Sequence, residues 1–200
     1  MGVKDTLPDP GMPANRPHLD HDSKAAQIID AAEELLLRDG YESTTMAAIA
    51  RQAGVSSNAV YWYFPGKDDL LAEVLRRRQE LALARLDATS NAPSLELAPA
   101  ALAELDSAAN LTAAIHERAK HSAAVADVHE EFHETVNRRL RTAFAAAGLS
   151  EADARMASAA IVAIVEGIHL HDAPRDTTAR DELVLWALQR FTDGTAGAAS

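Results

Sequence analysis

The stretch TTMAAIARQAGVSSNAVYWYFPGKDDLL, residues 44–71, predicts the fold of this chain and the arrangement of the rest around it. Its pattern is a short helix from Thr45 to Ala53, a turn at Gly54, a second short helix that Ser56 caps, and a third helix beyond Pro65. This order indicates a helix-turn-helix followed by a continuation helix.

Each boundary of this motif has a residue with a physical reason to be there. Thr45 is a good N-cap, because its hydroxyl oxygen can accept a hydrogen bond from a backbone amide of the first turn. Gly54 tolerates the left-handed backbone that ends many helices, and Pro65 stops the second helix. Apolar residues spaced three or four apart predict the buried face of each helix. They are Met46, Ile49, Ala50, Val60 and Phe64.

The second short helix carries the side chains that we expect to contact DNA. With Val60 turned to the core, a hydroxyl, an amide and aromatic rings with polar tips face outward, and such groups suit base edges and phosphates. These are Ser57, Asn58, Tyr61 and either Trp62 or Tyr63. Lys67 falls in the first turn of the next helix, where a phosphate would meet backbone amides and an ammonium group together.

A longer run of residues keeps a characteristic order and spacing around this motif. It consists of Gly40, Tyr41, Thr44, Thr45, Met46, Ile49, Ala50, Ala53, Gly54, Val55, Ser56, Val60, Tyr61, Trp62, Tyr63, Phe64, Lys67, Leu70 and Leu71. The run resembles the N-terminal signature of TetR-family transcriptional regulators. The resemblance implies an all-α homodimer, with N-terminal helix-turn-helix domains that bind the half-sites of a palindromic double-stranded operator. It also implies C-terminal helical domains that bind a small-molecule effector and form the dimer.

The resemblance further implies roles for single residues at the two short helices. The contacts in the DNA groove would be Ser57, Asn58 and Tyr61. The phosphate contacts would be Thr45, Tyr63 and Lys67, and Ser56 completes the predicted DNA-binding set. The first helix begins with Met46, Ala47 and Ala48, which leave little room for base contacts. Specificity is therefore expected to depend mainly on residues 56–63.

Composition limits the class of protein. With 200 residues, 48% of them hydrophobic, the chain can bury a sizeable core, and the absence of cysteine excludes disulfides and thiolate chemistry. No apolar run is long enough to cross a membrane, and the N-terminus lacks a signal-peptide pattern. We therefore expect a cytoplasmic protein that contacts no membrane. The resemblance to TetR-family regulators implies in addition that it uses no cofactor and is not an enzyme.

The net charge of −11 is unusual for a protein that binds nucleic acid. Residues 22–90 carry eight Lys or Arg against eleven Asp or Glu, and residues 91–200 carry nine against sixteen. The predicted DNA-binding part is therefore less acidic than the rest without being basic. Binding must depend on local groups such as Lys24, Arg51 and Lys67, and it should be strongly sensitive to salt.

Residues 1–21 predict a disordered arm, because they are rich in proline and show no apolar period. Lys4 and Arg16 could reach a minor groove from this arm. A passive tail is the simpler alternative.

The remaining chain is expected to be helical throughout. A first helix from Ser23 to Gly40 completes the DNA-binding domain, residues 22–66. A long helix from Lys67 leads into the effector-binding and dimerisation domain, residues 67–200, and so links the two parts mechanically. Further helices are expected near residues 99–108, 111–121, 124–147, 150–170 and 178–192.

The last two of these helices are apolar almost all round, which for helices of their length indicates burial on every side. A chain of this size cannot easily bury both at its C-terminal end, so we expect a twofold dimer whose interface is a four-helix bundle. A buried core within one monomer is the alternative. The expected interface residues are Ile161, Val165, Ile168, Leu183, Trp186 and Leu188.

One segment of the C-terminal domain, His129-Glu130-Glu131-Phe132-His133, fits the HExxH pattern of zinc metalloproteases. A protease would also need a third ligand and a substrate cleft beside a strand. Since no strand pattern is present, a zinc hydrolase is a remote alternative.

Helical geometry also places these two histidines at the edge of the buried face of their helix. Three interpretations follow for the two histidines. They are hydrogen-bonded core residues, or they line an effector pocket, or they belong to a metal-sensing site that His169 or His171 completes. Glu166 lies in an otherwise apolar helix and needs a polar partner, such as one of these histidines. The expected pocket residues are His116, His129, Phe132, His133, Glu166 and His169, and no metal is assigned to them.

These patterns and the resemblance together predict a DNA-binding transcriptional regulator, in the simplest case a repressor that a small molecule releases from its operator. The effector would shift an equilibrium between two existing conformations by preferring one of them. A metal-responsive regulator that uses His129 and His133, and a DNA-binding protein without an effector, are the alternatives.

Overall fold

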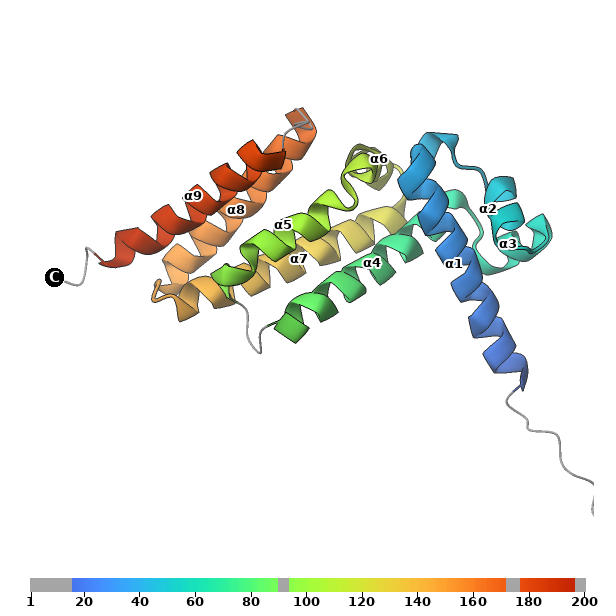
Figure 1. Cartoon of the computed structure of the whole chain (residues 1–200), viewed down its shortest axis with the longest axis horizontal. Helices are drawn as coiled ribbons and strands as arrows, with labels where there is room; N and C mark the ends of the chain where they lie inside the picture. The colour runs from blue at the N-terminus through green and yellow to red at the C-terminus, as the bar shows by residue number, and fades with distance from the viewer. Residues whose placement is uncertain (1–15, 90–93, 172–176, 197–200) are drawn as a thin grey trace, which may run out of the picture.

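The computed structural model is an elongated, all-helical molecule with a small N-terminal unit at one end of a longer body (Figure 1). It describes residues 16–89, 94–171 and 177–196. Within these ranges no strand occurs, and the predicted all-α class is confirmed. None of the helices described is both long enough and apolar enough to span a membrane.

Three helices form the N-terminal unit: α1 (Arg16–Ser43), α2 (Met46–Gln52) and α3 (Ser57–Tyr63). The hydroxyl oxygen of Thr45 accepts a hydrogen bond from the Ala48 amide at 3.1 Å. The hydroxyl oxygen of Ser56 accepts one from the Ala59 amide at 3.2 Å. Both predicted N-caps are therefore confirmed, and Gly54 between the helices has the left-handed φ of +66° that this turn requires.

The first helix is longer at its start than the sequence suggested. It begins at Arg16, so the prediction of Ser23 as its cap is wrong, and residues 16–21 of the predicted arm are helical. Between residues 18 and 24 no proline or glycine interrupts the helix, and a helix tolerates Pro17 in its first turn. The rest of the predicted arm, including Lys4, lies outside the described residues. At the other end, Gly40 leaves helical geometry with a φ of +80°, at the predicted position.

The long helix α4 (Lys67–Thr89) leaves the N-terminal unit and enters the body, as predicted. The body continues with η1 (Leu95–Leu97), α5 (Ala98–Asp106), α6 (Ala109–Ala119), α7 (Ala123–Ala146), α8 (Glu151–His171) and α9 (Thr177–Ala196). These helices correspond to the predicted ones, with ends that differ by a few residues. Helix α7 packs against α4, α6 and α8, while α9 packs on α8 and α5.

Two hydrophobic cores lie along the described part of the molecule. The first joins the N-terminal unit to the near end of the body, so it crosses the domain boundary predicted between residues 66 and 67. It includes Ile28, Val60, Leu70, Val74, Leu111 and Val125. The second holds the far end of the body together and includes Leu102, Phe144, Leu149, Ala157, Ile161, Val184 and Leu188. Because the first core is shared, α6 and α7 are connected to the N-terminal unit through packed side chains.

Candidate DNA-binding surface and ligand cavity

Helix α3 packs one face on the core and presents the other to solvent. Val60 is fully buried, whereas Tyr61 is 53% and Trp62 is 68% exposed. Ser57 and Asn58 are exposed in the first turn. The helix thus holds hydroxyl, amide, phenol and indole groups on a well-packed support, and such groups bind base edges and phosphates.

The two capping residues are exposed at the starts of α2 and α3. Thr45 and Ser56 each use a lone pair of the hydroxyl oxygen to accept the capping hydrogen bond. The hydroxyl hydrogen can still be donated to a phosphate oxygen. Capping and the predicted phosphate contact are therefore compatible.

Two residues of the predicted DNA-binding set are less exposed than expected. Tyr63 is half-buried and packs against the first core, with its ring centre 4.7 Å from that of Trp62. The Lys67 ammonium donates hydrogen bonds to the carbonyl oxygens of Tyr41 and Thr44 at 2.8 and 3.0 Å. A phosphate contact by Lys67 would have to share or replace these bonds. Trp62 is the most exposed aromatic residue of α3, and sequence reasoning left it out of the set in favour of Tyr63.

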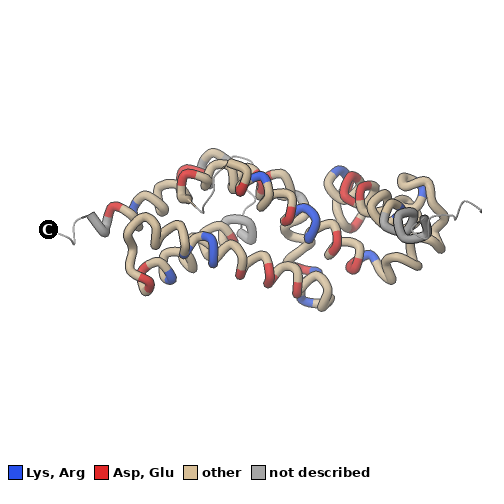
Figure 2. Tube along the Cα trace, turned by 90° about the horizontal axis from the view of Figure 1, so that it is seen from below, with Lys and Arg blue, Asp and Glu red and all other residues tan. Residues whose placement is uncertain are grey.

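Charge near this surface is mixed rather than basic. Lys and Arg positions are mixed with Asp and Glu positions along the trace, in the N-terminal unit as in the body (Figure 2). Helix α3 has no charged residue, and Arg51 lies exposed at the end of α2. Hydroxyl, amide and aromatic contacts must then supply much of any DNA recognition here.

A charged cluster, which we call the Asp68 cluster, joins the N-terminal unit to α6 and consists of Tyr41, Asp68 and Arg118. Arg118 donates hydrogen bonds from Nε and Nη2 to the two carboxylate oxygens of Asp68, at 3.0 and 2.6 Å. The Tyr41 hydroxyl donates a further hydrogen bond to Asp68. The hydrogen bonds from Arg118 hold the pKa of Asp68 below its usual value, while burial raises the pKa of Tyr41. The start of α4 is therefore bound to a specific position of α6.

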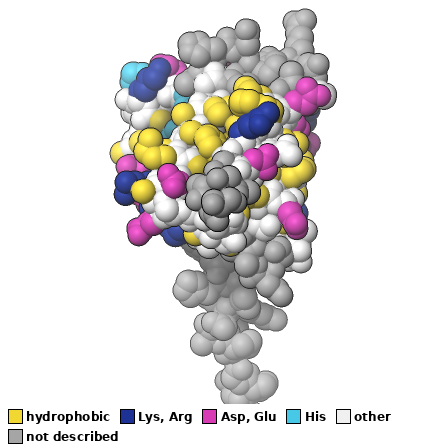
Figure 3. All heavy atoms as spheres, turned by 90° about the vertical axis from the view of Figure 1, so that its left-hand side faces the viewer, with side chains coloured by type: hydrophobic (Ala, Val, Ile, Leu, Met, Phe, Trp, Pro, Cys, Tyr) yellow, Lys and Arg dark blue, Asp and Glu magenta, His cyan; other side chains and the backbone are white. Residues whose placement is uncertain are grey.

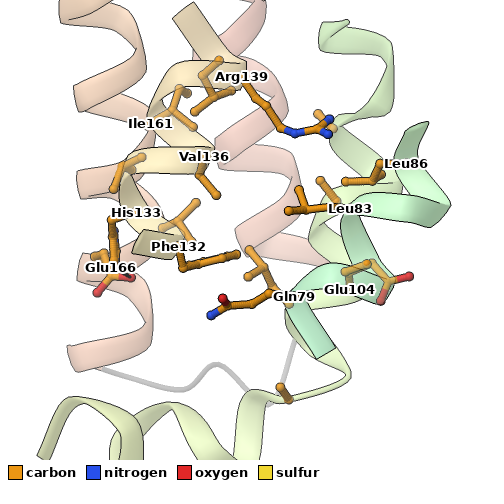
Figure 4. Close-up of a pocket in the computed structure, with 18 of the residues that line it drawn as sticks. Gln79, Leu83, Leu86, Glu104, Phe132, His133, Val136, Arg139, Ile161 and Glu166 are labelled. Carbon is orange, nitrogen blue, oxygen red and sulfur yellow. Dashed lines mark ion pairs between the residues drawn. The ribbon is translucent and has the colours of Figure 1, made fainter. Parts of the chain in front are cut away.

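A cavity of about 280 Å³ lies in the body among α4, α5, α6, α7 and α8. Its walls are mainly aliphatic and aromatic, with Leu83 and Leu86 on one side and Phe132, Val136 and Ile161 on the other (Figure 4). An apolar cavity with a few polar groups is typical of a site for a small organic ligand.

Four polar side chains gather at one end of this cavity; we call them the His–Glu cluster, and they are His116, His129, His133 and Glu166. One carboxylate oxygen of Glu166 lies 3.1 Å from His116 Nε2, and the other lies 3.4 Å from His133 Nε2. His133 Nε2 also lies 3.1 Å from His129 Nε2. Burial, and then the neighbouring His133 and His116, lower the pKa of His129. The prediction that Glu166 has a histidine partner is confirmed.

Of the six predicted pocket residues, the structure brings five to the cavity wall, and the side chain of His169 lies outside the described residues. The sequence missed the opposite wall, which α4 and α5 supply. Its residues include Gln79, Leu83, Leu86, Ala101 and Leu105. The spacing of the α4 residues was visible in the sequence. The packing of α5 and α7 near this helix depends on the tertiary fold and was not.

The charged side chains at the cavity wall have partners nearby. Arg139 bonds to Asp87 at 2.7 Å, and Glu104 bonds to Arg85 at 2.6 Å. Arg78 pairs with Glu33 of α1 at 2.6 Å. The cavity wall is thereby tied to α1 as well as to α6.

Helices α8 and α9 are apolar on two faces, and one of these faces is buried within the protomer. Ile161 and Leu188 are only 4% and 5% exposed and belong to the second core. Val165 packs against the same core, while the side chain of Ile168 lies outside the described residues. Two of the predicted interface residues, Ile161 and Leu188, are therefore already buried by packing within the protomer.

The other face of α8 and α9 is exposed. Its exposed apolar residues are Met156, Leu183, Leu185 and Trp186, at 67%, 43%, 38% and 56%. Figure 3 faces the end of the molecule where α8 and α9 lie and shows hydrophobic side chains gathered among charged ones. Exposed apolar groups gathered in this way mark protein–protein interfaces.

The protease interpretation of the HExxH segment is not supported. In a metalloprotease the glutamate after the first histidine acts as the general base beside the metal. Here Glu130 is exposed, and no strand borders the two histidines within the described ranges. The carboxylate that joins the histidines is Glu166 of another helix.

Comparisons with known proteins agree with this geometry. Residues 28–74 match a family model described as bacterial regulatory proteins, tetR family. The fatty acid metabolism regulator protein of Bacillus subtilis (strain 168) is 36% identical over 64 residues, 32% of this chain and 33% of that protein. The HTH-type transcriptional regulator SrpR of Pseudomonas putida is 49% identical over 53 residues, 26% of this chain and 25% of that protein. The matched segment thus spans a third or less of the length of these two relatives.

A solved structure extends the likeness to the body. The multidrug binding protein EbrR, complexed with imidazole, has a TM-score of 0.61 and 25% sequence identity to this chain. The match covers 84% of this chain and 94% of that structure. The overall fold is therefore similar over most of both chains.

Proposed function

Because residues 28–74 match the family model of bacterial regulatory proteins, tetR family, we propose that this chain is a TetR-family transcriptional regulator that binds double-stranded DNA under the control of a small-molecule effector. The observation that carries the proposal is the exposed face of α3. There, Ser57, Asn58 and Tyr61 stand on a short helix that the buried Val60 anchors to the core. Such a function places the protein with the DNA, in the cytoplasm.

The proposed active form is a homodimer. The exposed apolar residues of α8 and α9 are the surface for it, since a partner would remove groups such as Trp186 and Leu183 from water. In a twofold dimer, two copies of α3 read two half-sites related by the same symmetry, spaced by one helical turn of DNA or a multiple of it. The operator is therefore proposed to be palindromic.

The proposed effector site is the cavity of the body. Its apolar walls would bind a small organic molecule, and the His–Glu cluster would orient a polar group of that molecule. EbrR, which is similar in fold, is described as a multidrug binding protein, and this supports a ligand site in the body of the present chain. Repression that the effector relieves is the proposed mode of action.

Helix α6 offers the route from the cavity to the DNA-binding surface. His116 faces the cavity, and two residues later Arg118 holds Asp68 at the start of α4. A ligand that displaces His116 therefore moves the group that positions α4, and α3 is packed on the same core. In a dimer this changes the separation of the two recognition helices. The effector acts by preferring one of two conformations that already exist.

The experiment that tests the function is selection of bound sequences from a random DNA pool with purified protein at a stated salt concentration. We expect an enriched palindrome, and weaker binding of it by Tyr61→Ala, which removes an exposed contact and leaves the fold intact. Ala47→Ser, an exposed change on α2 outside the proposed contact set, is the matched control. A folded dimer that enriches no sequence would count against the proposal, and unchanged binding by Tyr61→Ala would show that α3 is not the recognition helix.

A further inference from the structure

We infer that the His–Glu cluster binds a divalent first-row transition-metal ion of the zinc class, with His116, His129, His133 and Glu166 as ligands. The inference deepens the proposed function, because all four residues line the proposed effector cavity, where Figure 4 labels His133 and Glu166. Its test measures metal binding directly, so it can fail or succeed separately from DNA binding.

The spacing of the ligand atoms carries the inference. Zinc binds imidazole nitrogen at about 2.0–2.1 Å in tetrahedral sites, so two ligand atoms of such a site lie roughly 3.3–3.4 Å apart. Three neighbouring pairs in the cluster lie at 3.1, 3.4 and 3.1 Å. In addition, one ligand atom each from His116, His129 and Glu166 all lie within 4.8 Å of one another. His116, His129 and Glu166 are therefore close enough to hold one ion. His133, next to both His129 and Glu166, would join them as the fourth ligand after a side-chain shift.

Three helices hold these ligands in position. His129 and His133 are four residues apart on α7, so helical geometry places them on one face. His116 comes from α6 and Glu166 from α8, and both helices pack against α7. The ring centres of His116 and His133 lie 4.9 and 4.4 Å from that of His129. The side chains are thus directed toward a common point by packed elements and not by a mobile loop.

The donor set decides which class of ion fits. Three imidazoles and one carboxylate suit zinc, copper, nickel or cobalt, whereas magnesium and calcium prefer sites made of oxygen atoms alone. The side chains of His116, His133 and Glu166 are 15%, 23% and 27% exposed, so the charge of Glu166 is only partly solvated. A bound cation would compensate that charge.

The sequence suggested a different completion of the site. In the metal-sensing alternative, the HExxH spacing supplies two histidines and His169 or His171 completes the site; the side chains of His169 and His171 lie outside the described residues. The structure places His116 and Glu166 next to the two histidines, from segments before and after α7. The alternative to a metal site is a hydrogen-bonded network among the same four side chains, in which one nitrogen of the His129–His133 pair is protonated.

The test is a titration of full-length protein, first stripped with a chelator and then dialysed, with Zn²⁺ against a chromophoric competitor. Co²⁺ serves as a spectroscopic probe of the ligand geometry. We expect one ion per chain and a visible Co²⁺ spectrum typical of four ligands. His129→Gln and Glu166→Gln should each weaken binding roughly tenfold or more and remove this spectrum. His121→Gln is the control, because His121 is exposed and bonds to Glu117 outside the cluster.

Two results would overturn the metal site: no binding by the wild-type protein, or equal binding by the cluster variants, which would place the ion on other histidines. Helical circular dichroism and melting curves confirm that each variant is folded. Glu166→Gln keeps the size of the side chain, so its Zn²⁺ affinity tests the site even if His129→Gln is unstable. Stripped protein that enriches a palindrome but takes up no Zn²⁺ refutes only the metal site. Protein that binds Zn²⁺ at the cluster but enriches no DNA refutes only the proposed function.

Discussion

At the scale of single residues, Asp68 shows how one side chain joins two parts of the molecule. It lies in the first turn of α4, accepts two hydrogen bonds from Arg118 of α6 and one from Tyr41 of α1. Its neighbour Asp69 lies in the same first turn but is exposed. The two carboxylates therefore share the favourable interaction with the helix N-terminus and differ in their tertiary contacts.

This difference predicts unequal effects of neutralising the two carboxylates. Asp68→Asn should lower the free energy of unfolding at pH 7 by about 1–3 kcal/mol, because it removes a charged acceptor from a partly buried pair. Asp69→Asn should lower the free energy of unfolding clearly less. Urea unfolding followed by circular dichroism measures both, and equal losses would show that the Asp68 cluster contributes nothing beyond the helix terminus.

The same cluster predicts a pH dependence with a defined sign. The pKa of Asp68 is lower in the folded protein than in the unfolded chain, so the folded state binds fewer protons. Its stabilisation is complete above the unfolded pKa of about 4 and is lost as the pH falls through the folded pKa. The stability difference between wild type and Asp68→Asn should therefore shrink between pH 7 and pH 3. A difference that grows on acidification would contradict the assignment.

At the scale of elements, glycines at a turn and inside a helix have opposite requirements. Gly54 joins α2 to α3 with a φ of +66°, a conformation that side chains with a Cβ atom disfavour. Gly167 lies within α8, and a Cβ atom added there would meet no atom within 4 Å. Gly54 is needed because of its backbone conformation, whereas Gly167 occupies an ordinary helical position that could accept a side chain.

We therefore predict that the same substitution, glycine to alanine, changes the stability of the fold in opposite directions at the two positions. Gly54→Ala should destabilise the fold by about 1–2 kcal/mol, because alanine is strained at positive φ. Gly167→Ala should stabilise it by about 0.5–1 kcal/mol through a lower loss of backbone entropy on folding. Thermal melting of the two variants beside the wild type is the measurement, and a stabilising Gly54→Ala would mean that the turn does not have this geometry in solution.

At the scale of the whole molecule, the elongated shape separates the three proposed sites along one axis. The proposed DNA contacts lie at one end, the cavity lies in the body, and the exposed apolar residues of α8 and α9 lie toward the other end (Figure 1). Helices α4 and α6 connect the cavity to the DNA-binding unit, and α8 connects it to the proposed interface. A dimer formed through α8 and α9 would therefore set the distance between the two recognition helices, and a movement of α4 or α6 would change it.

The proposed interface predicts that one exposed tryptophan matters for assembly and the other does not. Trp186→Glu should raise the dimer dissociation constant about thirtyfold or more, as expected for loss of an aromatic residue at the centre of an interface. Trp62→Glu introduces the same change on α3 and should leave the dimer intact. Sedimentation velocity over a range of concentrations distinguishes them, and equal behaviour of the two variants would place the interface elsewhere.

The sequence by itself determined the local elements and the resemblance to the TetR family. Caps such as Thr45 and Ser56, the positive-φ glycines, and the spacing of apolar residues act over a few positions along the chain, so their effects can be derived without knowing the fold. The extension of the first helix to Arg16 was missed, because nothing between residues 18 and 24 marks a helix start.

Only the tertiary structure decided which distant residues meet. The pairing of Glu166 with His116 and His133, the Arg118–Asp68 contact and the α4 wall of the cavity all depend on how helices pack, which sequence spacing does not encode. The same holds for α8 and α9, where an apolar pattern on all sides could not separate the face buried within the protomer from the exposed one. The physical reason is that burial drives packing without specifying partners, and the choice of partner is settled by shape and polar contacts across the whole body.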